Sequence, residues 1–498
     1  MNVIVLGAGP TGLTAALLLA RTGCEVVVLD RDPDAPPSNG RTWSDWRRPG
    51  VNQFRQPYIA LPRWHQVMRA ELPEVVDALS ALGGTRTNLL HLYPESVTGG
   101  WQTGDERFDT VTARRPVLEA AVASVAGTEP GLQIRRGQRA TGLLLDQERV
   151  VGVRTETETL SADLVVDASG RRTPVPGWLT AYGLGPTEQR SAEALTYYTR
   201  HVRGRSEALT GVSGALTHHE SYAVLTLPAD DCKGLAIIVG SADRALRVLR
   251  DPAVWEAALR ASGMDGRWLD GEPLGEVQPL AGLQDIVREY APNGVPVVHG
   301  LVAVGDAWAT TSPFLGRGLS LGALSAVALR DAVAGARSGH VGSSPGGSSP
   351  VEWESAGAKA ATATALESRY AELLGEQIRP YVTSTLDFGR HRVAEMTAQA
   401  TGRTYRTDDP AWAGSTALAA GAREDPLLLR AHSAIASLLA TPAEVFADPA
   451  IRERVGPWFG SPLCPPDRPG RAALLDAISR TSAADPERTL VPLRPAGS

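Results

Sequence analysis

The sequence predicts an α/β protein in which a domain with a parallel sheet is interrupted by a β-rich domain and followed by a helical region. The first 30 residues alternate between a buried strand (residues 3–6), a glycine-rich turn, a helix (13–21) and a second buried strand (25–29). This order is typical of a βαβ unit, whose strands are parallel. Residues 195–245 show the alternation of antiparallel strands instead, and from residue 352 onward the apolar spacing is helical.

Length and composition are those of a globular protein of two or three domains. The chain has 498 residues, 43% of them hydrophobic and 21% charged, and its net charge of −6 argues against binding to nucleic acid or to an anionic membrane. The three cysteines are far apart and lack metal-binding or CxxC spacing, and the first residues lack the basic segment of a signal peptide. We therefore expect a cytoplasmic protein with no membrane span and no nucleic-acid partner.

The domains predicted from these patterns are discontinuous in sequence. The first domain is expected to comprise residues 1–75, 105–175 and 290–335, and the second residues 76–104 and 176–289. Residues 337–351 are rich in glycine and serine and are expected to form a flexible linker. Residues 352–498 are expected to form a helical region that packs as a cap and takes no part in a site.

A glycine-rich turn connects the first strand to the first helix. Gly7, Gly9 and Gly12 form a GxGxxG motif, and Asp30 ends the second strand. The first glycine permits a tight turn, the second lets the backbone approach a pyrophosphate at the helix N-terminus, and the third lets helix and strand pack closely. The acidic side chain can accept hydrogen bonds from ribose hydroxyls. The residues predicted to line this dinucleotide site are Gly7, Gly9, Pro10, Thr11, Gly12, Asp30 and Arg31.

A GxGxxG motif alone does not separate NAD from FAD, but two later stretches do. The stretch "DLVVDASGRRT" (163–173) is a strand followed by a glycine turn with basic residues. The stretch "GDAWATTSPFLGRGLSLG" (305–322) follows a buried run at 301–304 and leads through a Pro- and Gly-rich turn into a helix of small residues. An acidic residue at a strand end, followed by free backbone amides, suits a ligand that the backbone approaches closely.

With these three motifs in this order, residues 1–335 resemble the flavoprotein monooxygenases of the para-hydroxybenzoate-hydroxylase fold, in a squalene-epoxidase-like actinobacterial branch. The resemblance implies a Rossmann-type FAD-binding domain interrupted by a β-rich substrate domain. It places Asp306 on the flavin ribityl chain, the following turn at the isoalloxazine ring, and the segment "RRPGVNQFRQPY" at the flavin edge. The cofactor residues implied in this way are Arg48, Gln53, Arg115, Gly305, Asp306, Pro313, Leu315, Gly316, Arg317 and Gly318.

The strands of the β-rich domain are expected to face the flavin ring, and their aromatic residues are candidates to line a substrate pocket. Tyr197, His201 and Tyr222 are the predicted substrate-side residues, with Tyr198 as a further candidate. Successive residues of a strand point to opposite faces, so about half of these four are expected to be structural. For the same reason the adjacent His218 and His219 cannot jointly hold a metal ion, and no other histidine spacing predicts one.

Two departures from the family pattern concern the reductant and the reaction. Ser169 stands before Gly170 where the hydroxylases usually have an aspartate linked to NAD(P)H contacts, and no second GxGxxG motif provides a nicotinamide domain. Electrons are therefore expected from NAD(P)H or, more efficiently, from a separate flavin reductase. The Trp-x-Trp-x-Ile-Pro signature and the active-site lysine of flavin halogenases have no match, which argues against halogenation.

The activity that the resemblance implies is FAD-dependent hydroxylation or epoxidation of a small, largely apolar molecule of natural-product type, through a C4a-hydroperoxyflavin. No catalytic residue is assigned, because an alkene substrate needs no general base. Two alternatives remain open: a cyclase that binds FAD in the same pocket without net redox chemistry, and an FAD-dependent dehydrogenase or reductase.

Overall fold

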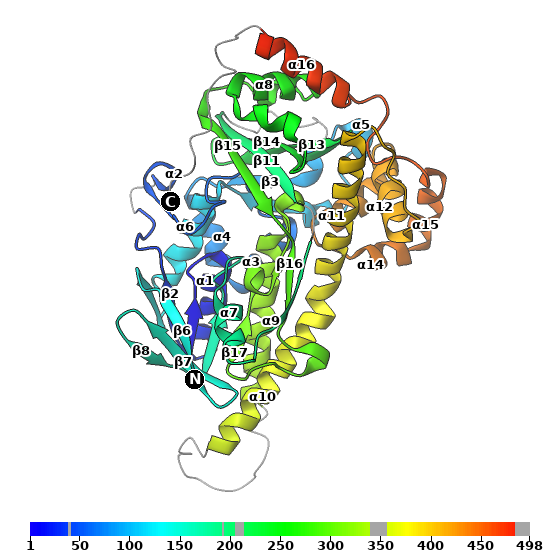
Figure 1. The fold of residues 1–498 in the computed structure, drawn as a ribbon. Coiled ribbons are helices and arrows are strands. Elements are labelled where there is room, and N and C mark those ends of the chain that lie inside the picture. Colours follow the sequence, from blue (N-terminus) through cyan, green and yellow to red (C-terminus); the bar gives the residue numbers. More distant parts are fainter. Residues whose placement is uncertain (38–40, 192–193, 205–213, 339–355, 484–498) are drawn as a thin grey trace.

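The computed structural model describes residues 1–37, 41–191, 194–204, 214–338 and 356–483. The predicted linker lies outside these residues, except that residues 337–338 end a helix. The predicted fold class is confirmed: a parallel sheet, an antiparallel sheet and C-terminal helices form three regions of the molecule (Figure 1). The division into domains at the residue numbers given above stays a prediction.

A five-stranded parallel sheet of order β17-β9-β1-β2-β5 forms the base of the first domain. Val3 and Val5 of β1 pack against helices on one face, and Ile4 and Leu6 pack on the other face against a small antiparallel sheet. Because both faces are covered, the strand is a continuous apolar run. The strands are β1 (Asn2–Leu6), β2 (Glu25–Asp30), β5 (Leu132–Arg136), β9 (Leu164–Asp167) and β17 (Leu301–Ala303), and the small sheet is β6 (Ala140–Asp146), β7 (Arg149–Thr155) and β8 (Thr159–Ser161).

The helices on the first face include the long helix α9 (Gly318–Ser338), which packs against α1 and α10. By length and composition the segment Gly318–Arg337 could cross a membrane, but 61% of it is buried inside the protein, as in a core helix. The other helices and small strands of the first 180 residues are α1 (Pro10–Arg21), α2 (Thr42–Asp45), α3 (Pro62–Glu71), α4 (Pro73–Ala81), α6 (Arg115–Ala126), α7 (Val175–Thr180), β3 (Thr85–Asn88), β4 (Asp109–Thr112) and α5 (Glu95–Thr98), the last of which packs against the C-terminal helix α13.

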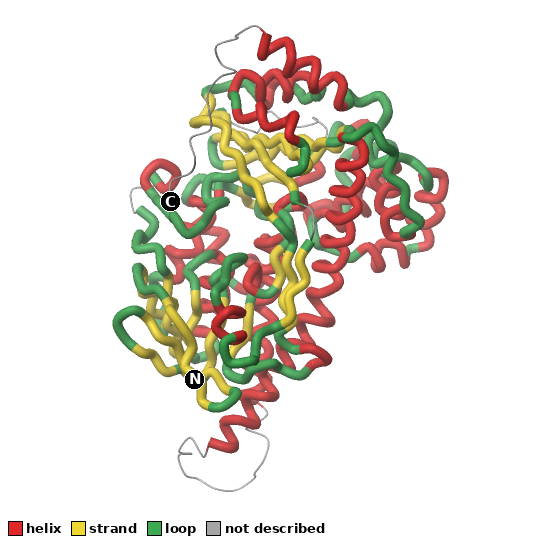
Figure 2. Tube along the Cα trace, in the orientation of Figure 1, coloured by secondary structure: helices red, strands yellow, loops and turns green. Residues whose placement is uncertain are grey.

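The second sheet is antiparallel, with the order β12-β13-β14-β11-β15, and lies above the first domain in Figures 1 and 2. One face packs on α8 (Pro252–Ala261) and α16 (Arg471–Ala483), and the other face is turned toward the first domain. A three-stranded sheet connects the two regions. The strands are β11 (Leu195–Arg203), β12 (Leu216–His219), β13 (Tyr222–Ala229), β14 (Cys232–Gly240) and β15 (Pro273–Leu283), with β10 (Thr187–Arg190), β16 (Ile286–Glu289) and β18 (Ala309–Thr310) in the connecting sheet.

The C-terminal helices cover one side of both sheets, as the yellow and orange segments of Figure 1 show. Helices α10 (Ala356–Leu373) and α11 (Arg379–Ala400) form a long rod, joined by a π-helical turn, and four shorter helices follow before α16. Each short helix begins with a proline after an Asp or Thr whose side chain caps the helix N-terminus, a strong local start signal. These helices are α12 (Pro410–Gly421), α13 (Pro426–Ala436), α14 (Pro442–Ala447) and α15 (Pro449–Val455).

Candidate functional site

A cavity of about 600 Å³ extends from the carboxyl ends of β1 and β2 to the antiparallel sheet and the C-terminal helices. This volume lies in the range of small-molecule and cofactor pockets, and the cavity opens where open α/β sheets bind their ligands. The cofactor residues expected from the sequence that line it are Gly7, Gly9, Pro10, Thr11, Gly12, Asp30, Arg31, Arg48, Gln53, Arg115, Asp306, Pro313, Leu315, Gly316, Arg317 and Gly318. Gly305 lies directly beside this set.

The glycine-rich turn has the geometry that its sequence predicts. Gly7 has φ +107°, and a Cβ added to it would lie 2.6 Å from the carbonyl oxygen of Ala168. A Cβ on Gly12 would lie 2.0 Å from the oxygen of Gly7, so only glycine permits this close packing. A Cβ on Gly9 would meet nothing within 4 Å, and no side chain caps the start of α1. The first-turn amides of α1 therefore face open space, and this arrangement suits a pyrophosphate.

The carboxylate of Asp30 is fixed at the end of β2 by the backbone and by an arginine. Its Oδ2 accepts hydrogen bonds from the amide of Ala8 (2.7 Å) and from Nη2 of Arg48 (2.5 Å), and its Oδ1 accepts one from the amide of Asp32 (2.9 Å). Each carboxylate oxygen can accept two hydrogen bonds, so Oδ1 keeps capacity for a ribose hydroxyl.

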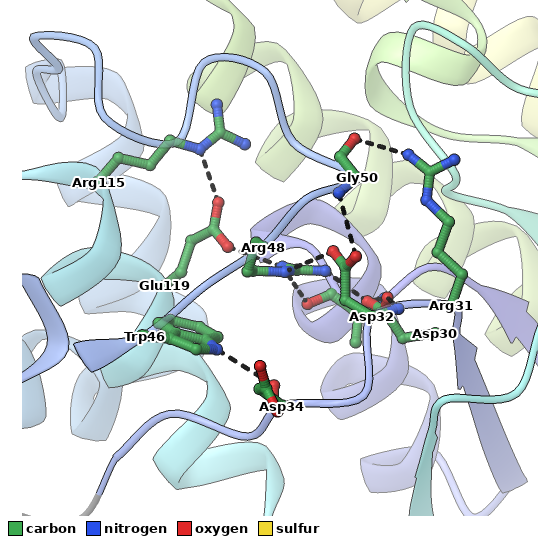
Figure 3. A network of polar contacts seen from close by, with 10 residues as sticks. Asp30, Arg31, Asp32, Asp34, Trp46, Arg48, Gly50, Arg115 and Glu119 are labelled. Atoms are coloured by element: carbon green, nitrogen blue, oxygen red, sulfur yellow. Dashed lines mark hydrogen bonds and ion pairs between the residues drawn. The ribbon is translucent and has the colours of Figure 1, made fainter. Parts of the chain in front are cut away.

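Arg48 is the centre of a buried ion network, shown in Figure 3. Its guanidinium donates to Asp30, to Asp32 (3.2 Å), to Glu119 (2.7 Å) and to the carbonyl oxygen of Ala8 (3.1 Å). Burial by itself would lower the pKa of Arg48, but the carboxylates of Glu119, Asp30 and Asp32 outweigh it and raise the pKa. The structure thus places this guanidinium among the carboxylates at the β2 end of the cavity. The resemblance noted in the sequence implies a different position, at the flavin edge.

Arg115 and Glu119 extend this network toward the middle of the cavity. Nε of Arg115 donates to Oε1 of Glu119 (2.6 Å), and its guanidinium lies 5.3 Å from the ring centre of Tyr58. Burial would lower the pKa of Arg115, but Glu119, Tyr58 and Asp306 raise it. Arg115 is therefore a permanent cation facing the loop that carries Asp306.

Asp306 lies at the end of β17, with its backbone held and its carboxylate free. Its carbonyl oxygen accepts hydrogen bonds from Nη1 of Arg288 (3.2 Å) and Oγ1 of Thr310 (2.8 Å), and the amide of Gly305 donates to Ser325 (3.0 Å). Within the described residues its carboxylate has no hydrogen-bond or ion-pair partner. Burial raises the pKa of Asp306, against the opposing effect of Arg115, Arg171 and Arg288. A carboxylate in this position can accept hydrogen bonds from hydroxyls of a ligand.

The turn after Asp306 leads into α9. Gly316 has φ +68°, in the left-handed region that favours glycine, and a Cβ on Gly318 would lie 3.5 Å from Oδ1 of Asp306. The amides at the start of α9 therefore lie close to the carboxylate and face the same cavity. This arrangement can hold a planar, hydrogen-bonding ring against the backbone.

The stretch 163–173 contains a turn after β9 that the side chain of Asp167 holds by hydrogen bonds. Oδ1 of the fully buried Asp167 accepts hydrogen bonds from the amide (3.0 Å) and hydroxyl (2.5 Å) of Ser169, and its Oδ2 accepts one from Thr173 (2.6 Å). Ser169 and Gly170 still line the cavity. The serine hydroxyl is thus committed to the turn.

Of the three residues predicted on the substrate side, one lines the cavity. Tyr197 lines the cavity, and its hydroxyl is 2.9 Å from that of Ser312. His201 lies on the same face of β11 but outside the lining, edge-on to Trp43, and burial together with Arg114 and Arg55 lowers its pKa to about 3. Tyr222 points to the opposite face of the sheet, where its hydroxyl donates to the carbonyl oxygen of Pro469 (3.1 Å).

Tyr198 also points away from the cavity, into the core beneath α8. Strand alternation explains these outcomes: Ala223 and Leu225, not Tyr222, belong to the inner face of β13. His218 lines the cavity while His219 stacks on Tyr222, so the adjacent histidines point apart as expected. Among the described residues no group of three His, Cys, Asp or Glu side chains could hold a metal ion.

The C-terminal helices supply a wall of the cavity that the sequence did not predict. Residues of α11, α12 and α13 and of the segment after α15 line it, so the expectation of a cap without a share in the site is wrong. The sequence carried one usable signal, because α13 interrupts its apolar pattern with Arg430 and His432. The lining residues from these helices include Phe388, Leu418, Ala422, Arg423, Leu429, His432, Ile435 and Arg468.

Comparison with known proteins agrees with a flavin site. Residues 2–172 match the family model described as FAD dependent oxidoreductase. The open cradle at Gly9, the fixed carboxylate of Asp30 and the free carboxylate of Asp306 suit the pyrophosphate, ribose and ribityl groups of FAD. The chain is an FAD-dependent oxidoreductase.

Particular relatives are distant. The chain is 29% identical to Protein Rv3254 of Mycobacterium tuberculosis over 366 residues. This match covers 67% of this chain and 73% of that protein. It is similar in fold to PqsL, a probable FAD-dependent monooxygenase from Pseudomonas aeruginosa, with a TM-score of 0.55 and 17% identity over 83% of this chain and 98% of that chain. It is also similar in fold to the myxobacterial chondrochloren halogenase CndH, with a TM-score of 0.56 and 16% identity over 99% and 98% of the two chains.

Replacement of Asp306 by alanine is expected to weaken FAD binding by about 10- to 100-fold, the value of one hydrogen bond to a charged group. The measurement is flavin titration of the apoprotein, followed by the absorbance that remains after gel filtration. Asp476→Ala on α16, where the carboxylate is 58% exposed and far along the chain from the site, serves as control. Unchanged flavin affinity in Asp306→Ala would show that this carboxylate does not contact the cofactor.

Proposed function

We propose that this FAD-dependent oxidoreductase is a monooxygenase that hydroxylates or epoxidises a small, largely apolar molecule. The observation that carries the proposal is the continuity of the cavity. It extends without a break from the glycine turn and the Asp306 loop to the inner face of the antiparallel sheet. Apolar residues line that part, among them Leu216, Leu225, Ala236, Leu280 and Phe314. A molecule bound there would lie against the ring that the Asp306 loop holds.

The reduced flavin, when bound, supplies the activation of O2, and the residues of the chain bind, orient and exclude water. The turn from Pro313 to Gly318 presents backbone to the ring, and the sheet face and the C-terminal helices close the pocket above it. Tyr197 and Ser312 form a neutral hydroxyl pair within this wall. Burial raises the pKa of Tyr197, so this hydroxyl stays protonated and can donate a hydrogen bond to a substrate oxygen.

Oxygen transfer is favoured over halogen transfer by the residues of the cavity. Flavin halogenases use an active-site lysine, whereas the cavity lining, all of it in the described part of the chain, contains none. Lys233 donates instead to the carbonyl oxygens of Arg267 (2.8 Å) and Asp270 (2.5 Å) beneath the antiparallel sheet.

We further propose that a separate flavin reductase supplies the electrons. The hydroxyl of Ser169 is committed to Asp167, so the motif position that the hydroxylases use for NAD(P)H offers no carboxylate here. Weak reduction by NADPH alone, and fast turnover with a reductase, are the expected behaviour.

The test is incorporation of oxygen from 18O2. The holoenzyme is supplied with reduced flavin by a reductase and NADH and incubated with a panel of apolar alkenes and arenes. We expect a product that carries one 18O atom, and no product without O2. Anaerobic conversion with FAD oxidised throughout, giving a product without new oxygen, would establish the cyclase alternative. Anaerobic reduction of FAD by the substrate would establish a dehydrogenase.

A further inference from the structure

The wall of the cavity formed by the C-terminal helices is basic. Arg423, Arg468 and His432 belong to this wall, and Arg317, in the turn before α9, hydrogen-bonds to Thr385 and Ile435 in it. All four side chains line the cavity, and we call these four residues the cap cluster. The acidic side chains that line the cavity are Asp30, Asp32 and Asp306, which belong to the cofactor end. The cap cluster therefore faces the pocket without a neutralising carboxylate in that wall.

Arg317 differs from every other buried arginine that the structure describes. Five arginines are less than 9% exposed, and four of them pair with a carboxylate: Arg48 with Glu119, Arg288 with Glu188, Arg392 with Glu395 and Arg430 with Asp105. Arg317 is 4% exposed and donates only to neutral groups.

The partners of Arg317 leave part of its guanidinium unused. Nη1 donates to Oγ1 of Thr385 (2.7 Å), Nη2 donates to the carbonyl oxygen of Ile435 (2.8 Å), and Nε has no partner. Burial lowers its pKa to about 10, which still leaves it charged at neutral pH. An uncompensated buried charge is costly, so an anion that enters the cavity would be bound strongly.

The other members of the cluster add one neutral and two cationic side chains. Burial and the charges of Arg317 and Arg423 lower the pKa of His432 to about 4, so its imidazole is uncharged at neutral pH. Nη1 of Arg423 donates to the carbonyl oxygen of Leu463 (3.2 Å), and burial and Arg468 lower its pKa. The carboxylates that act on Arg423, those of Asp467 and Glu424, are exposed and lie outside the lining.

Apolar side chains connect the cap cluster to the inner face of the antiparallel sheet. Phe314 and Phe388 stack with ring centres 6.5 Å apart, and His218 lies 5.7 Å from the Phe314 ring. Arg317 itself follows Gly316 in the turn that faces the flavin ring. A bound molecule with an anionic group on the cap cluster would therefore place its apolar body beside the reacting centre.

We propose that the cap cluster binds an oxyanion on the substrate, so that the substrate is an amphiphilic acid. This inference rests on the proposed function, because it assigns the substrate class to the same pocket. Arginine suits carboxylate and phosphate equally in geometry, so the anion is a free carboxylate or the phosphate of an ester. The apolar body binds along Phe314 and the sheet, and the cap cluster fixes its orientation.

The test is calorimetric binding of three ten-carbon probes to the FAD-loaded protein: decanoate, decyl phosphate and 1-decanol. We expect at least one anion to bind about tenfold or more tightly than the alcohol, the value of one charge-assisted hydrogen bond. The preference between the two anions identifies the source of the oxyanion. Equal binding of alcohol and anions, or no binding of either anion at millimolar concentration, would overturn the inference.

Variants of the half-buried arginines assign the preference to this cluster. The double variant Arg423→Gln and Arg468→Gln is expected to weaken the anion preference, of which Arg317 keeps a part, and to keep its affinity for 1-decanol. Arg452→Gln, exposed on α15, is expected to change neither. An anion preference that persists in the double variant with Arg317→Gln added would place the anion elsewhere and overturn the inference. Flavin absorbance is recorded in every titration. A protein that holds FAD but shows no anion preference contradicts this inference alone, and one that holds no FAD contradicts the proposed function.

Discussion

Gly9→Val is expected to abolish FAD binding while leaving the fold intact. Gly9 has φ −76° and ψ 172°, a conformation open to any residue, and a Cβ at this position meets no protein atom within 4 Å. The space that the side chain would fill is the space that a pyrophosphate needs at the start of α1. Loss of two charge-assisted hydrogen bonds, at about 2 kcal/mol each, corresponds to about 1000-fold in affinity. Flavin titration measures the loss of FAD affinity, and thermal unfolding of the apoprotein measures whether the fold is intact.

Two other glycines make this test specific. Gly335→Val, on an exposed turn of α9 with equally open space around the added Cβ, is expected to bind FAD like the parent. Gly12→Val places its Cβ 2.0 Å from the oxygen of Gly7 and is expected to lower the melting temperature of the apoprotein as well. If Gly9→Val binds FAD like the parent, the first βαβ unit is not the nucleotide site.

The parts of the site that the sequence predicted are those that depend on local geometry. A glycine that must adopt φ +107°, or that must touch a neighbouring carbonyl, is specified within a few residues of chain, so the motif spacing is enough to locate the turn from Gly7 to Gly12. The same holds for the Asp306 loop, where an acidic strand end, a glycine turn and a helix start follow one another directly.

The parts that the sequence did not predict depend on register and on long-range packing. Tyr222 and Ala223 are neighbours in one strand, and which of them faces the cavity depends on the side from which α8 and α16 cover the sheet. The cap cluster combines residues 317, 423, 432 and 468, whose proximity results from the way the C-terminal helices fold back. Arg317 was assigned to the cofactor by its place in a motif, and its buried, unpaired guanidinium is visible only in the structure.

Arg48 illustrates the same limit, because its partners lie 16, 18 and 71 residues away along the chain. Its side chain is 3% exposed, and those of its three acidic partners are between 2% and 6% exposed. The network fixes the carboxylate of Asp30 at the cavity and joins β2 to α6. Removal of this one cation would leave three buried carboxylates, of which Glu119 keeps its ion pair with Arg115 while Asp30 and Asp32 lose the ion pairs that they make with Arg48.

Arg48→Met is therefore expected to lower the free energy of unfolding by about 3–5 kcal/mol, the cost of breaking a buried ion pair from one side. Arg260→Met serves as control, because the Arg260 side chain is 57% exposed and pairs with Glu256 on the surface of α8. It should change the free energy of unfolding by less than about 0.5 kcal/mol. Urea unfolding of the apoproteins measures both. A loss in Arg48→Met no larger than that in the control would mean that the network contributes nothing to stability.

The deficit of Arg48→Met should also depend on pH, through Glu119. Burial would raise the pKa of Glu119, but Arg115 and Arg48 outweigh burial and hold the pKa below its ordinary value of 4.5. A carboxylate with a depressed pKa in the folded state stabilises the protein above the unfolded-state pKa, and this contribution is lost as the pH falls through the folded-state value. The variant loses part of that depression. The difference in unfolding free energy between parent and variant should thus be largest at neutral pH and narrow below about pH 4.5, whereas a difference independent of pH would show that Arg48 acts through packing alone.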